Sequence, residues 1–168
     1  SEDATNVSAT LTTSDEYITI QNDMAEFGTI PSNTTLTVEN GFTFTAAGDI
    51  PNGHVVEFEI ISSDNDSSWT SSAFVPAHAP ILAFVSYVVD DAAGNNNGRI
   101  DPGETVNLQV TMNNSGSSDA FDVMGLLTSM DPFVTIEADE AEYGEVDQNT
   151  EVTQNFTITA SIISPPGH

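Results

Sequence analysis

The sequence contains no cysteine, and Arg99 is the only Lys or Arg among its 168 residues. The lack of cysteine excludes disulfides, thiolate metal ligands and cysteine nucleophiles. Against this one cation stand 26 acidic residues, which give a formal net charge of −25. Phosphate binding depends on Lys and Arg, so the composition argues against nucleic acid and anionic membrane surfaces as partners. It favours cations, basic partners or a salty medium that screens the repulsion.

Long apolar runs and helical periodicity are also lacking. No run of 18 apolar residues is present, so we expect no membrane insertion. No signal peptide is evident, which for a secreted protein indicates a mature product or an internal fragment. Short runs rich in Thr, Val, Ile and Phe alternate instead with Gly and Asn turns, and this texture predicts an antiparallel β-sandwich. Strands are expected at 7–11, 17–20, 26–30, 35–45, 55–61, 72–75, 81–89, 105–112, 121–128, 133–136, 142–146 and 152–163.

An internal repeat organises these runs. Residues 3–34 align without a gap on residues 119–150, an offset of 119 − 3 = 116, and 14 of the 32 pairs are identical. After a two-residue slip the similarity resumes, with Phe42-Thr-Phe-Thr over Phe156-Thr-Ile-Thr. The chain therefore contains about one and a half copies of one module.

The alignment predicts two incomplete domains. Residues 1–79 form a partial repeat that lacks its first two strands, and residues 80–168 form a repeat that lacks its closing strands. Each would leave apolar faces and an unpaired strand edge, which natural proteins avoid or use for assembly.

The segment from Asp90 to Glu104 carries the sharpest motif. Oxygen donors follow the spacing of an EF-hand loop, at positions 3, 5, 7, 9 and 12, with Gly98 at the sharp turn. The donors are the side chains of Asn95, Asn97, Asp101 and Glu104 and the carbonyl of Arg99. Calcium prefers six to eight such oxygens.

The first loop position departs from this pattern, because Ala93 has no donor. Asp90 or Asp91 must therefore reach in from the preceding strand. The alternative is an Asx-rich turn that holds no ion. Of the two, the donor spacing favours calcium, in a structural role between two strands.

The remaining polar residues do not form a catalytic set. Glu57 and Glu59 alternate along one strand and fit a solvated face better than a glycosidase pair. His54 and His168 occupy equivalent Pro-x-Gly-His turns. Trp69 is expected to pack, with sugar stacking as the alternative. The sequence thus predicts a protein that is not an enzyme.

The stretch from Val89 to Ile136, with its DPGE and N-N-S-G strings, resembles the immunoglobulin-like modules of the CARDB type (cell-adhesion-related domains of bacteria). The resemblance covers nearly the whole chain. It implies tandem immunoglobulin-like antiparallel β-sandwiches in an extracellular, non-catalytic, calcium-compatible protein. It implies no particular glycan or protein ligand.

Two functional hypotheses follow. The first is a structural or adhesive repeat segment of a secreted bacterial surface protein or fibre. Its missing strands would come from a longer array, or from other copies of the module in a head-to-tail filament. The second is a carbohydrate- or protein-binding accessory module of a secreted enzyme such as a protease.

Overall fold

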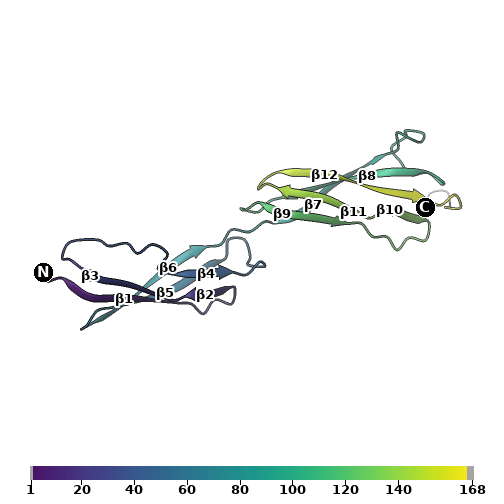
Figure 1. Cartoon of the computed structure of the whole chain (residues 1–168). Helices are drawn as coiled ribbons and strands as arrows, with labels where there is room; N and C mark the ends of the chain where they lie inside the picture. Colours follow the sequence, from purple (N-terminus) through teal and green to yellow (C-terminus); the bar gives the residue numbers. More distant parts are fainter. Residues whose placement is uncertain (1, 166–168) are drawn as a thin grey trace. The chain divides into compact units, whose positions relative to one another are not determined.

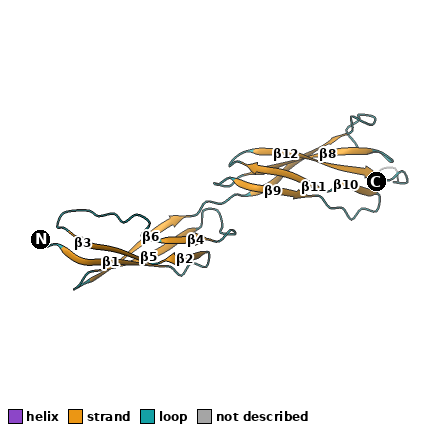
Figure 2. Ribbon diagram, viewed as in Figure 1, coloured by secondary structure: helices purple, strands orange, loops and turns teal. Residues whose placement is uncertain are grey.

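The computed structural model describes residues 2–165, and every regular element in that range is a β-strand (Figure 2). All strand pairs in this part of the chain are antiparallel. Within the same residues, no helix is long and apolar enough to cross a bilayer. The chain divides into two compact units, unit 1 from Ser1 to His78 and unit 2 from Ala79 to His168.

Unit 1 contains two sheets (Figure 1). The larger has the order β3-β1-β5-β6, and the smaller pairs β2 with β4. The strands are β1 (Ala4–Thr12), β2 (Ile18–Asn22), β3 (Met24–Ile30), β4 (Thr43–Ala46), β5 (Val55–Ser63) and β6 (Ser68–Pro76).

Unit 2 also contains a four-stranded and a two-stranded sheet. Here the larger has the order β10-β12-β8-β7, and the smaller pairs β11 with β9. The strands are β7 (Leu82–Asp90), β8 (Thr105–Asn114), β9 (Ala120–Leu126), β10 (Val134–Ala138), β11 (Glu140–Val146) and β12 (Glu151–Ala160).

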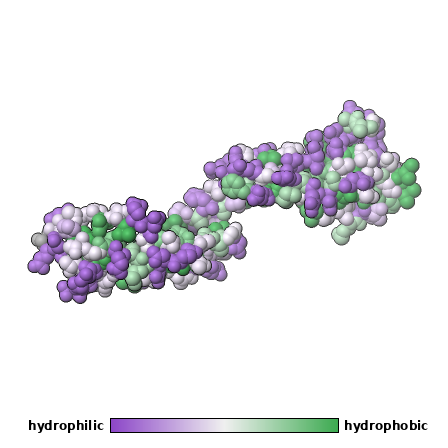
Figure 3. All heavy atoms as spheres, in the orientation of Figure 1, coloured by the Kyte–Doolittle hydropathy of each residue, from purple (hydrophilic) through white to green (hydrophobic). Residues whose placement is uncertain are grey.

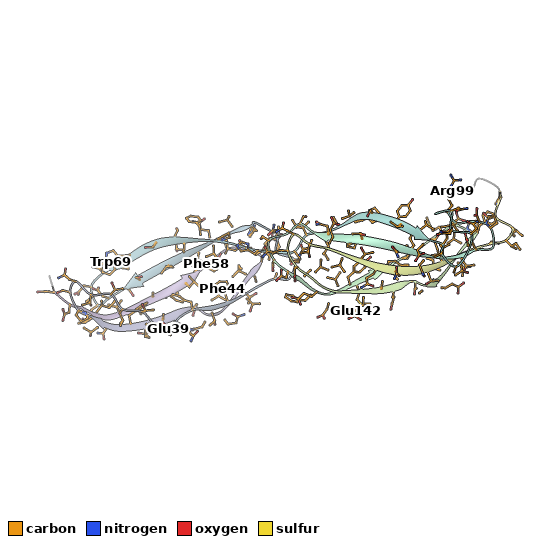
Figure 4. All side chains as sticks on the ribbon, turned by 90° about the horizontal axis from the view of Figure 1, so that it is seen from above. Glu39, Phe44, Phe58, Trp69, Arg99 and Glu142 are labelled. Carbon is orange, nitrogen blue, oxygen red and sulfur yellow. The ribbon has the colours of Figure 1, made fainter. Side chains whose placement is uncertain are left out.

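The core of unit 1 forms where β2 and β4 pack on the larger sheet. Side chains alternate across a strand, so Val56 and Phe58 of β5 point inward while Glu57 and Glu59 remain in solvent. The ring of Phe58 meets that of Phe44 from β4, with centroids 4.8 Å apart (Figure 4). Burying a side chain of this size contributes roughly 1.5–3 kcal/mol.

The core of unit 2 lies between β11 and the larger sheet. Tyr143, Val146 and Phe156 are its largest buried members. The hydroxyl of Tyr143 donates to the carbonyl of Val110 on β8, so its polar end is satisfied inside the sandwich. Burial raises the pKa of the Tyr143 hydroxyl.

The internal repeat is visible in hydrogen bonds as well as in residue identities. The amide of Leu11 donates to the carbonyl of Asp23 over 2.8 Å, and the amide of Leu127 donates to Asp139 over the same distance. A β-bulge interrupts both strand pairs at the matching place, where Gly28 and Gly144 each have φ of 70°. Glycine adopts such an angle at no steric cost, which accounts for its presence at this bulge in both repeats.

The repeat alignment also shows that the four-stranded sheet of each unit corresponds to the two-stranded sheet of the other. Strands β1, β2, β3 and β4 correspond to β9, β10, β11 and β12. Unit 1 adds β5 and β6 beside β1, whereas unit 2 adds β7 and β8 beside β12. Each unit is thus a four-stranded sheet packed on a two-stranded one, and the added hairpin lies in opposite sheets.

Most predicted strands differ from the observed ones by a few residues at an end, and for three of them strand pairing explains the difference. The expected strand at 35–45 is reduced to Thr43–Ala46, because β4 pairs with β2 alone, over four residue pairs. The strand expected from 72 begins earlier, at Ser68, because β6 pairs with β5 over nine residue pairs. The strand expected at 152–163 ends at Ala160, where pairing with β10 stops.

Candidate metal centre

The Asp-rich loop connects β7 to β8 and is folded around the side chain of Asp91. This carboxylate is only 2% exposed. It accepts hydrogen bonds from the backbone amides of Asn97, at 2.7 Å, and Gly98, at 3.2 Å. Gly98 has φ of 75°, so it turns the chain sharply enough to present both amides. Asp91 therefore places a carboxylate inside the loop, whereas Ala93 has no side-chain donor.

Glu104 closes the loop from its other end. One carboxylate oxygen accepts from the amide of Asn95 and the other from the amide of Asp101, both at 3.1 Å. The chain passes so close to Glu104 that a Cβ added at Gly94 would lie 1.6 Å from its Oε1. Gly94 and Glu104 thus form a fitted contact that any larger residue at position 94 would disrupt.

The side chains between these ends are hydrogen-bonded to one another. The amides of Asn95 and Asn97 both donate to Oδ2 of Asp101. These hydrogen bonds, together with the charge of Arg99, hold the pKa of Asp101 below its ordinary value. An amide that rotates by half a turn presents its oxygen in place of its NH₂ group, and that oxygen suits a hard cation.

The predicted residues fall into two groups. Asp91, Asn95, Asn97, Asp101 and Glu104 are linked by the hydrogen bonds just described. Asp90 lies apart, since its carboxylate accepts from the amide of Ala92 in a local turn. The amide of Arg99 donates to the Asn97 side chain, and Figure 4 shows the Arg99 side chain extending away from the ribbon.

A second acidic group was not predicted. Side-chain oxygens of Asp119, Glu145 and Asp147 lie within 4.8 Å of one another, so these three residues have the geometry to hold one metal ion. Asp119 lies 26 positions before Glu145, and no local spacing motif connects them. The bulged pair of β9 and β11 brings them together.

The repeat helps to interpret this acidic triad. Asp119 accepts a hydrogen bond from the amide of Gln148 at 2.8 Å, and its counterpart Asp3 accepts from the amide of Ser32 at 2.9 Å. The counterparts of Glu145 and Asp147 are Thr29 and Pro31. Asp119 therefore has a turn-fixing contact that recurs where the other two carboxylates are missing.

The donor sets distinguish the two places chemically. The loop offers carboxylate, amide and carbonyl oxygens at alternate positions, whereas the triad offers three carboxylates alone. The loop also holds a buried carboxylate and a glycine that makes room for Glu104. These features fit a calcium ion better than the surface triad does.

Known proteins provide no independent identification. No family model, no curated protein and no solved structure matches the chain.

Proposed function

We propose that this chain is a non-catalytic structural or adhesive repeat segment of a secreted bacterial surface protein or fibre. The observation that carries the proposal is the duplicated hydrogen-bond pattern, which includes the Leu11–Asp23 and Leu127–Asp139 bonds. Duplicated sandwich modules suit extended extracellular proteins, because each repeat acts as a spacer with its own core. The CARDB-type resemblance of residues 89–136 supports the same assignment.

The finer architecture in this proposal is a tandem immunoglobulin-like sandwich. When the matching strands are superimposed in order, a full module has eight strands. One sheet corresponds to β10-β12-β8-β7 and the other to β3-β1-β5-β6. Two antiparallel four-stranded sheets with a shared core are typical of such sandwiches.

Calcium is the proposed cofactor, bound in the loop between β7 and β8. It would neutralise Asp91, Asp101 and Glu104 and fix the connection between the two strands. Because Asn95 and Asn97 contribute no charge, the affinity should lie in the weak range of extracellular modules. A chain without disulfides gains a staple in this way.

The alternative is an accessory module that binds carbohydrate or protein for a secreted enzyme. Trp69 favours this reading, because its side chain is 55% exposed on β6 and aromatic faces stack on sugars. A glycan array would test it. Binding that is lost in Trp69→Ala and kept in Phe74→Ala would support the accessory module.

The main proposal is tested in the organism that makes the protein. An antibody against the chain should label intact cells or the secreted fraction. Its target should have a mass well above 17.8 kDa, as expected for a segment of a larger repeat protein. Labelling confined to the cytosol would contradict the proposal.

A further inference from the structure

Matching strands of the two units have different neighbours. Strand β12 is bordered by β8 along nine residue pairs, but its counterpart β4 has no second partner among residues 2–165. Conversely, β1 is bordered by β5, whereas its counterpart β9 pairs with β11 alone in the described chain. Each unit therefore has one open edge at the place where the other unit has a hairpin.

Matching side chains are more buried in the unit where the strand has a second neighbour. Ile158 of β12 is 6% exposed, and its counterpart Phe44 of β4 is 44% exposed. The backbone shows the same effect: residues 151–156 are a strand beside β8, while their counterparts at 37–42 form no strand. The open edge at β4 thus carries a sequence that forms a paired strand where a neighbour is present.

Apolar side chains reach the surface in both units (Figure 3), and the two hairpins contribute to them. On β6, Val75 is paired with the buried Val56, so it lies on the core-facing side, and the alternation places Trp69 there too. On β7, Phe84 and Tyr87 are paired with Met112 and Val110, which belong to the core of unit 2. Trp69, Phe84 and Tyr87 are each more than half exposed.

A groove of about 880 Å³ marks this uncovered face in unit 2. Its floor includes Tyr87, Val89, Leu108 and Ile158, from three strands of the larger sheet. The loop segment from Gly98 to Pro102 forms one wall. In a complete sandwich two further strands beside β9 would cover this floor. They would correspond to β5 and β6, which lie beside β1 in unit 1.

We propose that unit 1 of one chain docks on unit 2 of a second copy of the chain, so that each covers the open face of the other. Strand β4 of one copy lies beside β7 of the other, and β6 lies beside β9. The inner face of β6 then lies over β8 and that of β7 over β5, with Trp69 near the groove. This names the partner in the proposed repeat architecture and rests on that proposal.

Strand directions permit both new pairings at once. Strand β7 runs in the same sense as β12, and β6 runs in the same sense as β1, because each pair is separated by one antiparallel neighbour. Suppose that unit 1 is first oriented like unit 2, with matching strands parallel. A half-turn of unit 1 about an axis perpendicular to the sheets then reverses the directions of both β4 and β6. Both junctions then become antiparallel, and the result is a sandwich of two six-stranded sheets with continuous hydrogen bonding.

The contact is apolar although each chain carries a net charge of −25. Glu57 and Glu59 lie on the outer face of β5, away from the proposed contact. Salt screens repulsion between exposed charges but leaves apolar burial in place. Association should therefore strengthen as the salt concentration rises, in contrast to an interface held by ion pairs.

The first experiment uses light scattering to measure the average molar mass of the protein in solution over a range of protein and salt concentrations. The mass should exceed 17.8 kDa and rise with both variables. Trp69→Asp and Tyr87→Asp should each reduce the mass to that of one chain, with Val75→Asp as a second variant on the unit 1 face. The matched controls are Phe74→Asp and Val88→Asp, which alter outer-face residues of similar exposure and should leave association unchanged.

A mixing experiment then tests the direction of the contact. Trp69→Asp leaves the docking face of unit 2 unchanged, and Tyr87→Asp leaves the docking face of unit 1 unchanged. Each variant alone should be monomeric, and an equal mixture should form a pair of two chains. Circular dichroism establishes that the variants are folded. A wild-type chain that remains monomeric at high salt and concentration, or a mixture that stays monomeric, would overturn the docking while leaving the cell-surface assignment in place.

Discussion

The imidazole Nε2 of His54 lies 2.6 Å from the carboxylate Oδ2 of Asp15. This contact joins the turn before β5 to the segment before β2, across 39 positions of sequence. The ring of Tyr17 packs edge-on against the imidazole, with centroids 5.1 Å apart. Hydrogen bonds from His54 and from the Tyr17 amide hold the pKa of Asp15 below its ordinary value of 3.8.

The first prediction concerns acid. Because the folded-state pKa of Asp15 is lowered, the pair stabilises the fold fully above the ordinary pKa, and this contribution is lost as the pH falls through the lowered pKa. His54→Ala should raise the pKa of Asp15 towards 3.8. Carboxyl titration by NMR measures the pKa of Asp15 in each variant. Urea unfolding at pH 6 and pH 3 measures the loss of stability in acid, which should be smaller in His54→Ala than in the wild type. His78→Ala is the control, and an unchanged Asp15 titration in His54→Ala would contradict the assignment.

The second prediction concerns calcium. Saturating calcium should raise the melting midpoint, since an ion that binds only the folded state at a hundred times its Kd stabilises by about 2.7 kcal/mol. Asp91→Asn should abolish this rise in the melting midpoint, because it replaces the buried carboxylate at the centre of the loop with a neutral amide. Calorimetry with calcium and with chelator provides the measurement.

Glu145→Gln is the matched control, since it neutralises a carboxylate of the acidic triad and leaves the loop intact. A calcium response lost in Glu145→Gln and kept in Asp91→Asn would move the site to Asp119, Glu145 and Asp147. If the wild-type midpoint is the same with calcium and chelator, the chain has no stabilising calcium site.

The third prediction uses glycine to probe the shape of the loop. Gly94→Ala would place a Cβ 1.6 Å from Oε1 of Glu104, so the carboxylate must move away and lose its bond to the Asn95 amide. Calcium affinity measured by titration calorimetry should fall at least tenfold, or about 1.4 kcal/mol. Gly48→Ala is the control, because a Cβ there meets no atom within 4 Å. Equal affinities in the two variants would show that Glu104 is not a ligand.

The fourth prediction concerns Asn114, which is fully buried at the end of β8. Its amide donates to the carbonyls of Ser118 and Val146, and its oxygen accepts from the amides of Ile81 and Gly116. Asn114→Ala leaves these backbone groups without a partner, and each buried one costs roughly 1–3 kcal/mol. The free energy of unfolding should therefore fall by at least about 3 kcal/mol.

Chemical denaturation checks this value. Asn113→Ala is the comparison, because the Asn113 amide makes a single long contact of 3.4 Å to the carbonyl of Thr150. It should cost less than about 1 kcal/mol. Similar losses in the two variants would show that the Asn114 network adds little stability.

Local patterns in the sequence accounted for much of the fold. The alternation of Glu57 and Glu59 predicted a solvated face on β5, and both residues are exposed, because side-chain direction in a strand follows from the backbone alone. The repeat predicted which turns correspond, and the matching φ values of Gly28 and Gly144 have the same local origin. Loop spacing also singled out Asn95, Asn97 and Asp101, which hydrogen bonds link within the loop, and their role as calcium ligands stays a prediction.

Features that depend on distant partners could not be predicted in this way. The expected strand at 35–45 has strand-forming residues, yet only Thr43–Ala46 is paired, because an isolated edge provides no ladder for the rest. The contact between Asp15 and His54 and the triad around Asp119 are tertiary. Neither leaves a spacing signal, since each depends on where two separate turns meet.

Asp23 and Asp139 each occupy the single position between a strand of one sheet and a strand of the other. The chain passes from β2 to β3, and from β10 to β11, without a loop that could absorb a change in length. One inserted residue at either place would turn every following side chain to the opposite side, exposing Ala25 or Tyr143 and burying acidic neighbours. Asp23 and Asp139 therefore mark positions where the length of the chain cannot vary.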